Sequence, residues 1–383
     1  MRDVMAELEA WWRSGESVGV GTVVGTWKSA PRQPGASMLV GPHGVAVGSV
    51  SGGCVEGAVY ELAETCRETG VPVLQRYGIS DDDAYTVGLT CGGIIDIFIE
   101  QVNRDSFPEF GAVAEDIRDG RPVAVATLIS GVGSEQLGRR LVVRGQGATG
   151  SLGSARLDDA VRDDLEGMLL QGRTGIVHYG PDGERRGDDI AVFVASYAPR
   201  PRMIVFGAID FAAAVGRIGA FLGYRVTVCD ARATFATAKR FPDADEVIVQ
   251  WPHRYLRDTE VDPRTVVCVL THDPKFDVPL LEIALRMPLA YVGAMGSRRT
   301  NADRLEKLRE LGLSDEEVSR LHAPIGLDVG ARTPEETAVS VAAELIAVRW
   351  RGTGSPLRAI DGPIHHDIDH DRTATATVDK EPS

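Results

Sequence analysis

The second half of this 383-residue chain alternates short β-type runs with helical stretches. Because parallel neighbouring strands need a crossover connection, such alternation is typical of a parallel, doubly wound sheet. A helix is expected over 210–222. A Rossmann-like domain is therefore predicted over residues 200–351, with strands at 203–206, 225–229, 246–250, 266–270 and 289–292.

The first half predicts a mixed architecture. A helix over 4–13 precedes a strand over 18–26, a hairpin turn at 41–44 and a helix over 55–67. We expect an N-terminal α+β domain at 1–103 and a middle α+β segment at 104–198, with a continuation of the first domain as the alternative for that segment. The fold class is α/β overall, an α+β domain followed by a Rossmann-like one. Residues 352–383 lack periodicity and are expected to form a disordered tail.

Composition excludes several classes of protein. A hydrophobic fraction of 43% with 25% charged residues is ordinary for a soluble globular protein. The net charge of −14 argues against nucleic acid as the main partner. No apolar run is long enough to cross a membrane. The five cysteines are an odd number at wide spacing, which disfavours a disulfide framework, and acidic residues stand where a secretory signal would be basic. A cytoplasmic location is expected.

Two cysteines lie beside glycine pairs in mirror order: Ser51-Gly52-Gly53-Cys54 and Thr90-Cys91-Gly92-Gly93. Each sequence adjoins a β-type run. Glycine permits positive φ and close approach of a ligand to the backbone. A thiol on such a loop suits a soft metal, a sulfur atom or a covalent adduct. The alternative is a pair of small buried hydrophobic side chains at tight turns.

The turn after the first predicted strand of the second half departs from a dinucleotide fingerprint. Gly207 and Ala212 fit the pattern G-x-G-x-x-G/A, but Ile209 replaces its middle glycine and Asp210 adds negative charge. Asp230 ends the second strand, as a ribose-binding acid would. The fold is thus expected to be Rossmann-like, whereas NAD(P) binding is not expected.

Two further loops follow predicted strands and so face the edge where such sheets bind ligands. Thr271-His272-Asp273 contains a candidate acid/base pair, for which a capped turn is the alternative. Gly296-Ser297-Arg298-Arg299 opens a helix and is a candidate anion site, for which a plain turn with surface arginines is the alternative.

Together these sequences resemble the XdhC/CoxI family of accessory proteins for molybdenum hydroxylases. The resemblance covers about residues 15–102 and 200–350. Its motifs are Gly48-Ser-Val-Ser-Gly-Gly-Cys54-Val-Glu56-Gly57, Gly88-Leu-Thr-Cys91-Gly-Gly-Ile-Ile-Asp-Ile-Phe-Ile-Glu100, Thr271-His-Asp, Tyr291-Val-Gly-Ala-Met-Gly-Ser-Arg-Arg299 and Pro324-Ile-Gly-Leu-Asp-Val-Gly-Ala-Arg-Thr-Pro-Glu-Glu336.

The resemblance implies a non-catalytic chaperone that binds molybdenum cofactor, as the pterin phosphate or its cytosine dinucleotide. It implies that a cysteine desulfurase sulfurates the bound cofactor and that a target molybdenum hydroxylase receives it. Cys54 and Cys91 are the candidate molybdenum or sulfur contacts. The other candidate cofactor contacts are Gly52, Gly53, Glu56, Gly92, Gly93, Gly207, Asp230, His272, Asp273, Gly296, Ser297, Arg298 and Arg299. A homodimer is also expected.

Two competing hypotheses remain. One is an NAD(P)-dependent oxidoreductase that uses the Rossmann-like domain, with His272 as acid/base. The other is active sulfur transfer, in which Cys54 or Cys91 carries a persulfide.

Overall fold

The computed structural model describes residues 1–361 except 28–31, 79–92, 146 and 272. The chain divides into two compact units, Met1–Pro199 and Arg200–Ser383. The first unit has two sheets and the second has one, and each unit has hydrophobic clusters of its own. The predicted fold class, an α+β part followed by a Rossmann-like part, is confirmed.

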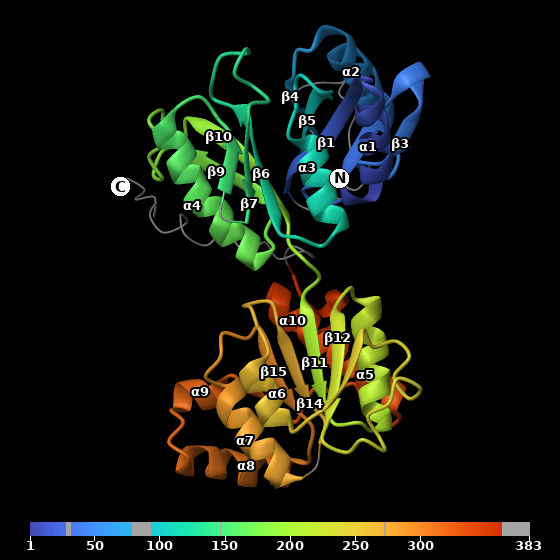
Figure 1. Cartoon of the computed structure of the whole chain (residues 1–383), viewed down its shortest axis with the longest axis vertical. Helices are drawn as coiled ribbons and strands as arrows, with labels where there is room; N and C mark the ends of the chain where they lie inside the picture. The colour runs from blue at the N-terminus through green and yellow to red at the C-terminus, as the bar shows by residue number, and fades with distance from the viewer. Residues whose placement is uncertain (28–31, 79–92, 146, 272, 362–383) are drawn as a thin grey trace, which may run out of the picture. The chain divides into compact units, whose positions relative to one another are not determined.

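The first unit contains two five-stranded antiparallel sheets, each built from about half of the unit (Figure 1). We call these halves the first and second repeats. The first repeat, with sheet order β3-β2-β1-β5-β4, consists of α1 (Met5–Ser14), β1 (Val18–Trp27), β2 (Ser37–Val40), β3 (Ala46–Gly48), α2 (Glu56–Thr69), β4 (Val73–Tyr77) and β5 (Ile94–Val102). The predicted turn at 41–44 does join antiparallel strands β2 and β3.

The second repeat has the same order of elements along the chain and the same order of strands, β8-β7-β6-β10-β9. It consists of α3 (Phe110–Arg118), β6 (Val123–Ser130), β7 (Arg140–Arg144), β8 (Gly147–Gly150), α4 (Ala155–Gln171), β9 (Gly175–Tyr179) and β10 (Ile190–Tyr197). The middle segment is therefore a second version of the first topology.

The strand register also repeats. Thr22 pairs with Phe98 in the first sheet, and Thr127 pairs with Phe193 in the second. Each of these strand pairs has a register shift just beyond that position, between Val23 and Gly25 in the first sheet and between Leu128 and Ser130 in the second. Because a slip of one residue would turn every side chain to the other face of a sheet, a shared register and a shared irregularity mark equivalent positions.

The two repeats pack together through equivalent surfaces. Val18, Val20 and Val102 of the first repeat share a core cluster with Val123, Val125 and Tyr197 of the second. Trp12 of α1 contacts Phe110 of α3, with ring centroids 5.8 Å apart.

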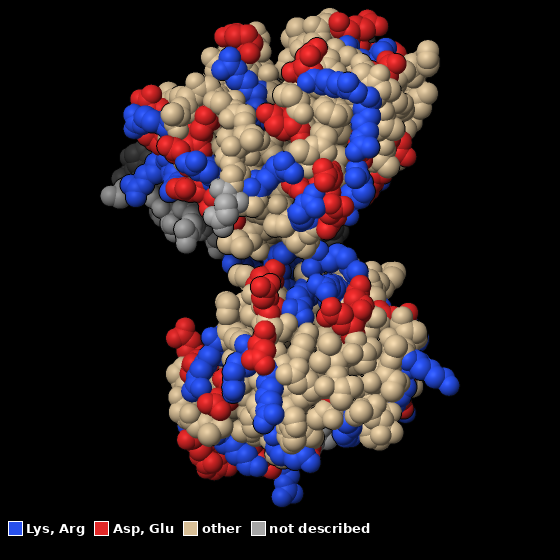
Figure 2. Space-filling model, viewed as in Figure 1, with Lys and Arg blue, Asp and Glu red and all other residues tan. Residues whose placement is uncertain are grey.

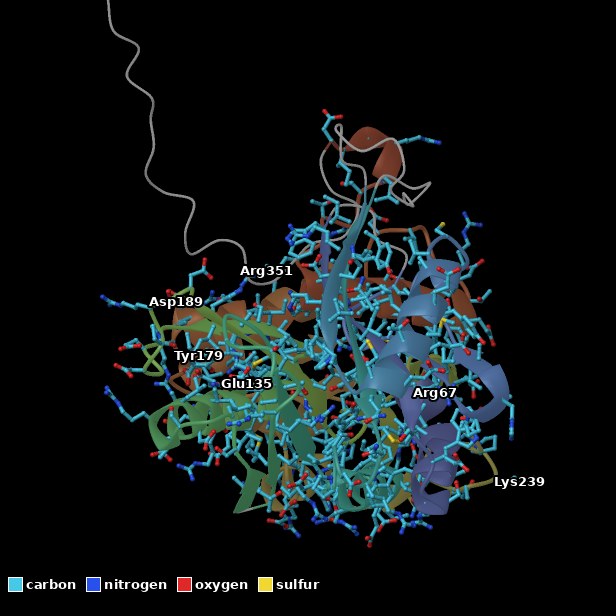
Figure 3. All side chains as sticks on the ribbon, turned by 90° about the horizontal axis from the view of Figure 1, so that it is seen from above. Arg67, Glu135, Tyr179, Asp189, Lys239 and Arg351 are labelled. Carbon is cyan, nitrogen blue, oxygen red and sulfur yellow. The ribbon has the colours of Figure 1, made fainter. Side chains whose placement is uncertain are left out.

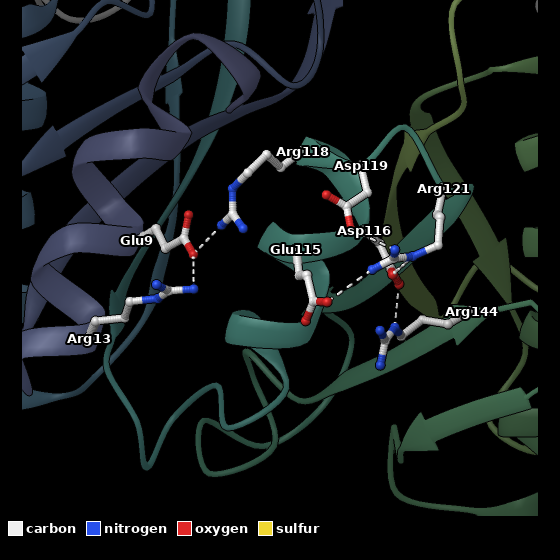
Figure 4. Close-up of polar contacts among 8 residues, drawn as sticks. All are labelled: Glu9, Arg13, Glu115, Asp116, Arg118, Asp119, Arg121 and Arg144. Atoms are coloured by element: carbon white, nitrogen blue, oxygen red, sulfur yellow. Dashed lines mark hydrogen bonds and ion pairs between the residues drawn. The ribbon is translucent and has the colours of Figure 1, made fainter.

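Polar contacts reinforce this packing. Arg118 of α3 donates to Glu9 of α1 (Figure 4). A buried ion pair joins Arg140 Nη2 to Glu100 Oε1 at 2.5 Å.

The second unit contains one parallel six-stranded sheet in the order β13-β12-β11-β14-β15-β16. Its elements are β11 (Arg202–Phe206), α5 (Asp210–Phe221), β12 (Arg225–Asp230), β13 (Glu246–Val249), α6 (Pro252–Asp258), β14 (Val266–Val269), α7 (Pro274–Ala284), β15 (Tyr291–Ala294), α8 (Arg298–Glu310), α9 (Asp315–Ser319), β16 (Leu321–His322) and α10 (Pro334–Trp350). The last predicted strand begins two residues later than expected, at Tyr291.

Alternate residues of β11 face two different cores. Met203 and Val205 pack with α5 and α10, whereas Ile204 and Phe206 pack with α6, α7 and α8. Burial on both faces explains the continuous apolar run of this strand. A capping box begins the last helix: Thr333 accepts from the Glu336 N–H, and the Glu336 carboxylate accepts from the Thr333 N–H.

Within the described residues, none of the helices is both long and apolar enough to span a bilayer. Basic and acidic side chains are interspersed on the face shown in Figure 2. Residues 352–361 of the predicted tail are described and include a short 3₁₀ helix, Leu357–Ala359. The remainder of that tail, 362–383, lies outside the described residues.

Candidate functional site

The loop that carries Cys54 is organised around the carboxylate of Glu56. This side chain, at the start of α2, accepts hydrogen bonds from the backbone N–H groups of residues 50, 51, 52 and 53 at 2.8–3.2 Å. It also accepts from the hydroxyls of Ser49 at 2.7 Å and Ser51 at 2.5 Å. Burial raises the pKa of Glu56, but the bonds from Ser51, Ser49 and the backbone more than offset this, so the pKa falls to about 2.

This arrangement changes what the loop offers to a ligand. Its backbone N–H groups point inward to a carboxylate that already stands at the helix N-terminus, where negative charge is stabilised. Gly52 and Gly53 have φ of +82° and +122°, and a Cβ at either position would meet no atom within 4 Å. The exposed side of the loop is therefore open backbone leading to the partly exposed Cys54.

Gly48 ends β3 directly before this loop, in a backbone conformation that requires glycine. Its φ is +86°, and a Cβ there would lie 2.4 Å from the carbonyl oxygen of Ser37. Gly150 is the equivalent glycine of the second repeat: its φ is +84°, and a Cβ there would lie 2.3 Å from the Arg140 carbonyl oxygen. There the Asp158 carboxylate closes the loop by accepting from Ser151 Oγ at 2.6 Å and the Leu152 N–H at 2.7 Å.

Three segments of the first repeat meet at one end of its sheet. Ala63 lies over Gly19 and Val59 over Gly21, so α2 runs antiparallel to β1. The start of α2 thus lies toward the end of β1, where Trp27 pairs with Ile94, the first residue of β5. Tyr77 ends β4 at the same place, paired with Ile95.

Of the second predicted glycine–cysteine sequence, Gly93 lies within the described residues. Gly93 is buried and directly precedes β5. Cys91 and Gly92 lie outside the described residues.

In the second unit, the turn after β11 is tied to its neighbours. Gly207 has φ of +108°, and a Cβ there would lie 2.9 Å from Thr271 Cγ2, so the turns after β11 and β14 are in close contact. Ile209 occupies the N-cap position of α5, where its side chain makes no capping hydrogen bond and packs against the core. Asp210 is exposed and pairs with Arg240 at 3.2 Å.

Asp230 does end β12 as predicted, but internal donors occupy its carboxylate. It accepts from the Ala208 N–H at 2.7 Å and from Arg232 through Nε and Nη2 at 2.9 and 2.7 Å. Burial raises the pKa of Asp230, and these bonds more than offset it, so the pKa lies below its usual value. Arg232 also lies over the ring of Phe235, 4.7 Å from its centroid.

Asp273 acts as the N-cap of α7. Its carboxylate accepts from the Lys275 N–H at 3.1 Å and pairs with Lys275 Nζ at 2.8 Å. This is the capped turn that the sequence left open as an alternative. His272 lies outside the described residues.

The candidate anion loop opens α8, with Ser297 as its N-cap accepting from the Thr300 N–H at 3.1 Å. Arg298 and Arg299 are exposed. Beneath the loop lies Arg304, whose Nη2 donates to Asp277 at 2.9 Å and to the Met295 carbonyl at 3.0 Å.

The buried Arg304 side chain links two of the loops that follow strands of the parallel sheet. Both the Arg304 and Asp277 side chains are only 4% exposed, and Asp277 also accepts from the Thr271 hydroxyl. The pair therefore joins the turn after β14 to the turn after β15. Arg304 Nη1 is buried without a hydrogen-bond partner among the described atoms.

Sequence reasoning missed the residues that organise these loops: Ser49, Arg232, Asp277, Arg304 and Glu344. Glu344 of α10 accepts from the Gly326 N–H at 2.7 Å and so anchors the segment before the last helix. Arg304 and Asp277 read as polar positions of amphipathic helices, so no local signal marks them as buried. The spacing of Asp230 and Arg232 was a usable signal, because an acid and a base two residues apart after a strand can pair locally.

The other cysteines are less suited to ligand chemistry. Cys66, Cys229 and Cys268 are buried. Burial raises the pKa of Cys229 and Cys268 to about 12 and that of Cys66 above its usual value. Among the side chains that the structure describes, no group of three or more His, Cys, Asp or Glu is placed to hold a metal ion.

Comparison with known families covers both units. Residues 203–345 match the XdhC Rossmann domain, and residues 11–78 and 116–180 match the XdhC and CoxI family. The chain belongs to the XdhC and CoxI family. The two N-terminal matches fall one on each repeat, which agrees with their shared topology.

Curated relatives span nearly the whole chain. A Bacillus subtilis protein named as a probable xanthine dehydrogenase subunit is 29% identical, over 90% of this chain and 97% of its own length. The Escherichia coli molybdenum cofactor insertion chaperone PaoD is 28% identical, over 88% of this chain and 85% of its own.

A solved structure agrees. The crystal structure of a Bacillus halodurans protein, described as a xanthine dehydrogenase, has a TM-score of 0.64 and 25% identity. The match covers 92% of this chain and 98% of that one.

Proposed function

We propose that this chain is an accessory protein that binds molybdenum cofactor, protects it, supports its sulfuration and inserts it into a xanthine dehydrogenase- or carbon monoxide dehydrogenase-type hydroxylase. The observation that carries the proposal is similarity across both units to a protein named as a molybdenum cofactor insertion chaperone. Membership of the XdhC and CoxI family supports the same role.

The geometry of the Cys54 loop supports a cofactor contact in the first repeat. The thiol is partly exposed, the neighbouring glycine backbone is open, and the Glu56 carboxylate holds the loop in one shape. Thiolate is a soft ligand suited to a molybdenum–sulfur centre. Cys91 remains the second proposed thiol. In this reading Glu56 shapes the site from beneath rather than contacting the cofactor.

In the second unit, taken by itself, we propose an anion site. The start of α8, with Ser297, Arg298 and Arg299, would hold the pterin phosphate or its cytosine dinucleotide. Gly207, Asp273 and Gly296 stay proposed contacts along the same sheet edge, and His272, which lies outside the described residues, stays a candidate from the sequence. Because internal donors occupy Asp230, its part would be to fix the Gly207 turn rather than to bind a ribose.

Retention of pterin tests the proposal. The purified protein is incubated with molybdenum cofactor released from a donor enzyme, desalted and oxidised, and the co-eluting fluorescent pterin is quantified. Near-stoichiometric pterin is expected, with loss in Cys54→Ala and in Cys91→Ala. Cys66→Ala is the matched control, because that thiol is buried on α2 away from the loop.

Other outcomes would redirect the proposal. Retention of pterin by both cysteine variants at the wild-type level would show that neither thiol contributes to binding. No retention by the wild type, together with tight NADH or NADPH binding in a fluorescence titration, would favour the oxidoreductase alternative. Added sulfur on Cys54 or Cys91 after incubation with a cysteine desulfurase, measured by mass spectrometry, would identify a persulfide carrier. Size-exclusion chromatography with light scattering tests the proposed homodimer, and cell fractionation tests the proposed cytoplasmic location.

A further inference from the structure

The two repeats of the first unit place a tyrosine at equivalent positions. Tyr77 ends β4 and pairs with Ile95, and Tyr179 ends β9 and pairs with Ile190. Both side chains are buried, with 4% and 0% of their surfaces exposed. Tyr179 is labelled in Figure 3.

The hydroxyl groups of these tyrosines differ. Tyr179 donates to Asp164 Oδ2 of α4 at 2.8 Å, across a sequence separation of fifteen residues. The residue at the same separation before Tyr77 is Leu62 of α2. Leucine cannot accept a hydrogen bond, and Tyr77 Oη has no partner among the described residues.

The unpaired hydroxyl belongs to the repeat that carries the cysteine loop. A buried hydroxyl without a partner costs free energy, and natural proteins seldom leave one without a reason. The second repeat shows that this topology can satisfy the group with a carboxylate. The first repeat lacks that carboxylate and has Gly52, Gly53 and Cys54 in the neighbouring loop.

Tyr77 also lies at the same end of the first repeat as the Cys54 loop. It belongs to the core cluster that includes Val50 and Val55, the residues on either side of the Ser51-Gly52-Gly53-Cys54 sequence, and Cys54 packs against that cluster. Burial raises the pKa of Tyr77 to about 12, so at neutral pH the group keeps its proton and can donate it in a hydrogen bond.

We propose that the Tyr77 hydroxyl donates a hydrogen bond to the ligand held at the Cys54 loop, and that Tyr77 is therefore a binding residue of this site. This inference rests on the proposed function. The chemistry selects a ligand atom that accepts a hydrogen bond, such as the oxygen or sulfur of a metal centre or a pterin carbonyl. Tyr179 has no such role, because Asp164 already occupies its hydroxyl.

Two matched variants test the structural premise without any ligand. Tyr77→Phe removes a hydroxyl that has no partner among the described residues, so the melting temperature should stay unchanged or rise. Tyr179→Phe leaves the Asp164 carboxylate without its phenolic donor, so the melting temperature should fall by about 2–4 °C for each lost kcal/mol in a unit of this size. An equal fall in both variants would show that Tyr77 has a structural partner and would overturn the inference.

The binding test uses molybdenum cofactor released from a donor enzyme as the probe. Tyr77→Phe should retain pterin about tenfold more weakly than wild type, whereas Tyr179→Phe should retain it equally well. Equal retention by wild type and Tyr77→Phe would refute the role of Tyr77 and leave the proposed function intact. No retention by wild type would refute the proposed function, and the inference would fail with it.

Discussion

Replacement of Glu56 by glutamine should open the Cys54 loop, because this carboxylate holds four consecutive backbone N–H groups. Its pKa is lowered from 4.5 to about 2, which sets a ceiling of about 3.4 kcal/mol on the contribution of the charged form. Since the side chain is only partly buried, solvent screening reduces this, and we expect about 2 kcal/mol.

The assay is hydrogen–deuterium exchange with mass spectrometry of the peptide around residues 49–55. A decrease of about 2 kcal/mol in the free energy of opening the loop corresponds to amide exchange about 30-fold faster at neutral pH. The second-repeat loop around Ser151–Asp158 is the internal control, because it is closed by its own carboxylate and should exchange at the wild-type rate.

The pH dependence has a definite sign. The pKa of Glu56 is lower in the folded protein than its value of 4.5 in the unfolded chain. Its charged form therefore stabilises the closed loop fully above pH 4.5, and this contribution disappears as pH falls toward 2. The difference between wild type and Glu56→Gln should therefore be constant from pH 7 to about pH 5 and shrink below it. Exchange within twofold of wild type at neutral pH, or a difference that grows on acidification, would refute this reasoning.

Two further predictions concern stability. Arg304→Met should destabilise the second unit by about 3–5 kcal/mol in urea unfolding, because it removes the arginine that pairs with the buried Asp277 carboxylate; a loss below 1 kcal/mol would show that this pair does not hold the two loops. Gly48→Ala and Gly150→Ala should each lower the melting temperature, because both need positive φ and have a carbonyl oxygen within 2.4 Å of the added Cβ. Gly57→Ala, in open space on α2, is their control and should be neutral or stabilising.

Much of the second unit could be predicted from sequence because its signals are local. The β11 run is apolar at successive positions, which marks a strand buried on both faces, and the capping box at Thr333 lies within four residues. The position of Asp230 at the end of β12 followed from the same periodicity.

The candidate sites were less predictable because they depend on contacts between segments. The sequence places Cys54 before a helix, as the structure confirms, but it does not show that Glu56 takes up the loop N–H groups. The lack of a described partner for the Tyr77 hydroxyl becomes informative only when Tyr77 is compared with Tyr179. That comparison needs the structure, because the two repeats are related mainly by strand register rather than by runs of identical residues.

The buried Glu100–Arg140 pair determines which halves can associate. By strand register, Glu100 corresponds to Ala195 and Arg140 to Ser37, so the pair occurs once and joins unlike repeats. Two copies of the first repeat facing each other would bury glutamates without arginines, and two copies of the second would bury arginines without glutamates. Uncompensated buried charge is costly, so a chain during folding is directed to close its first half onto its second rather than onto the same half of a neighbouring chain.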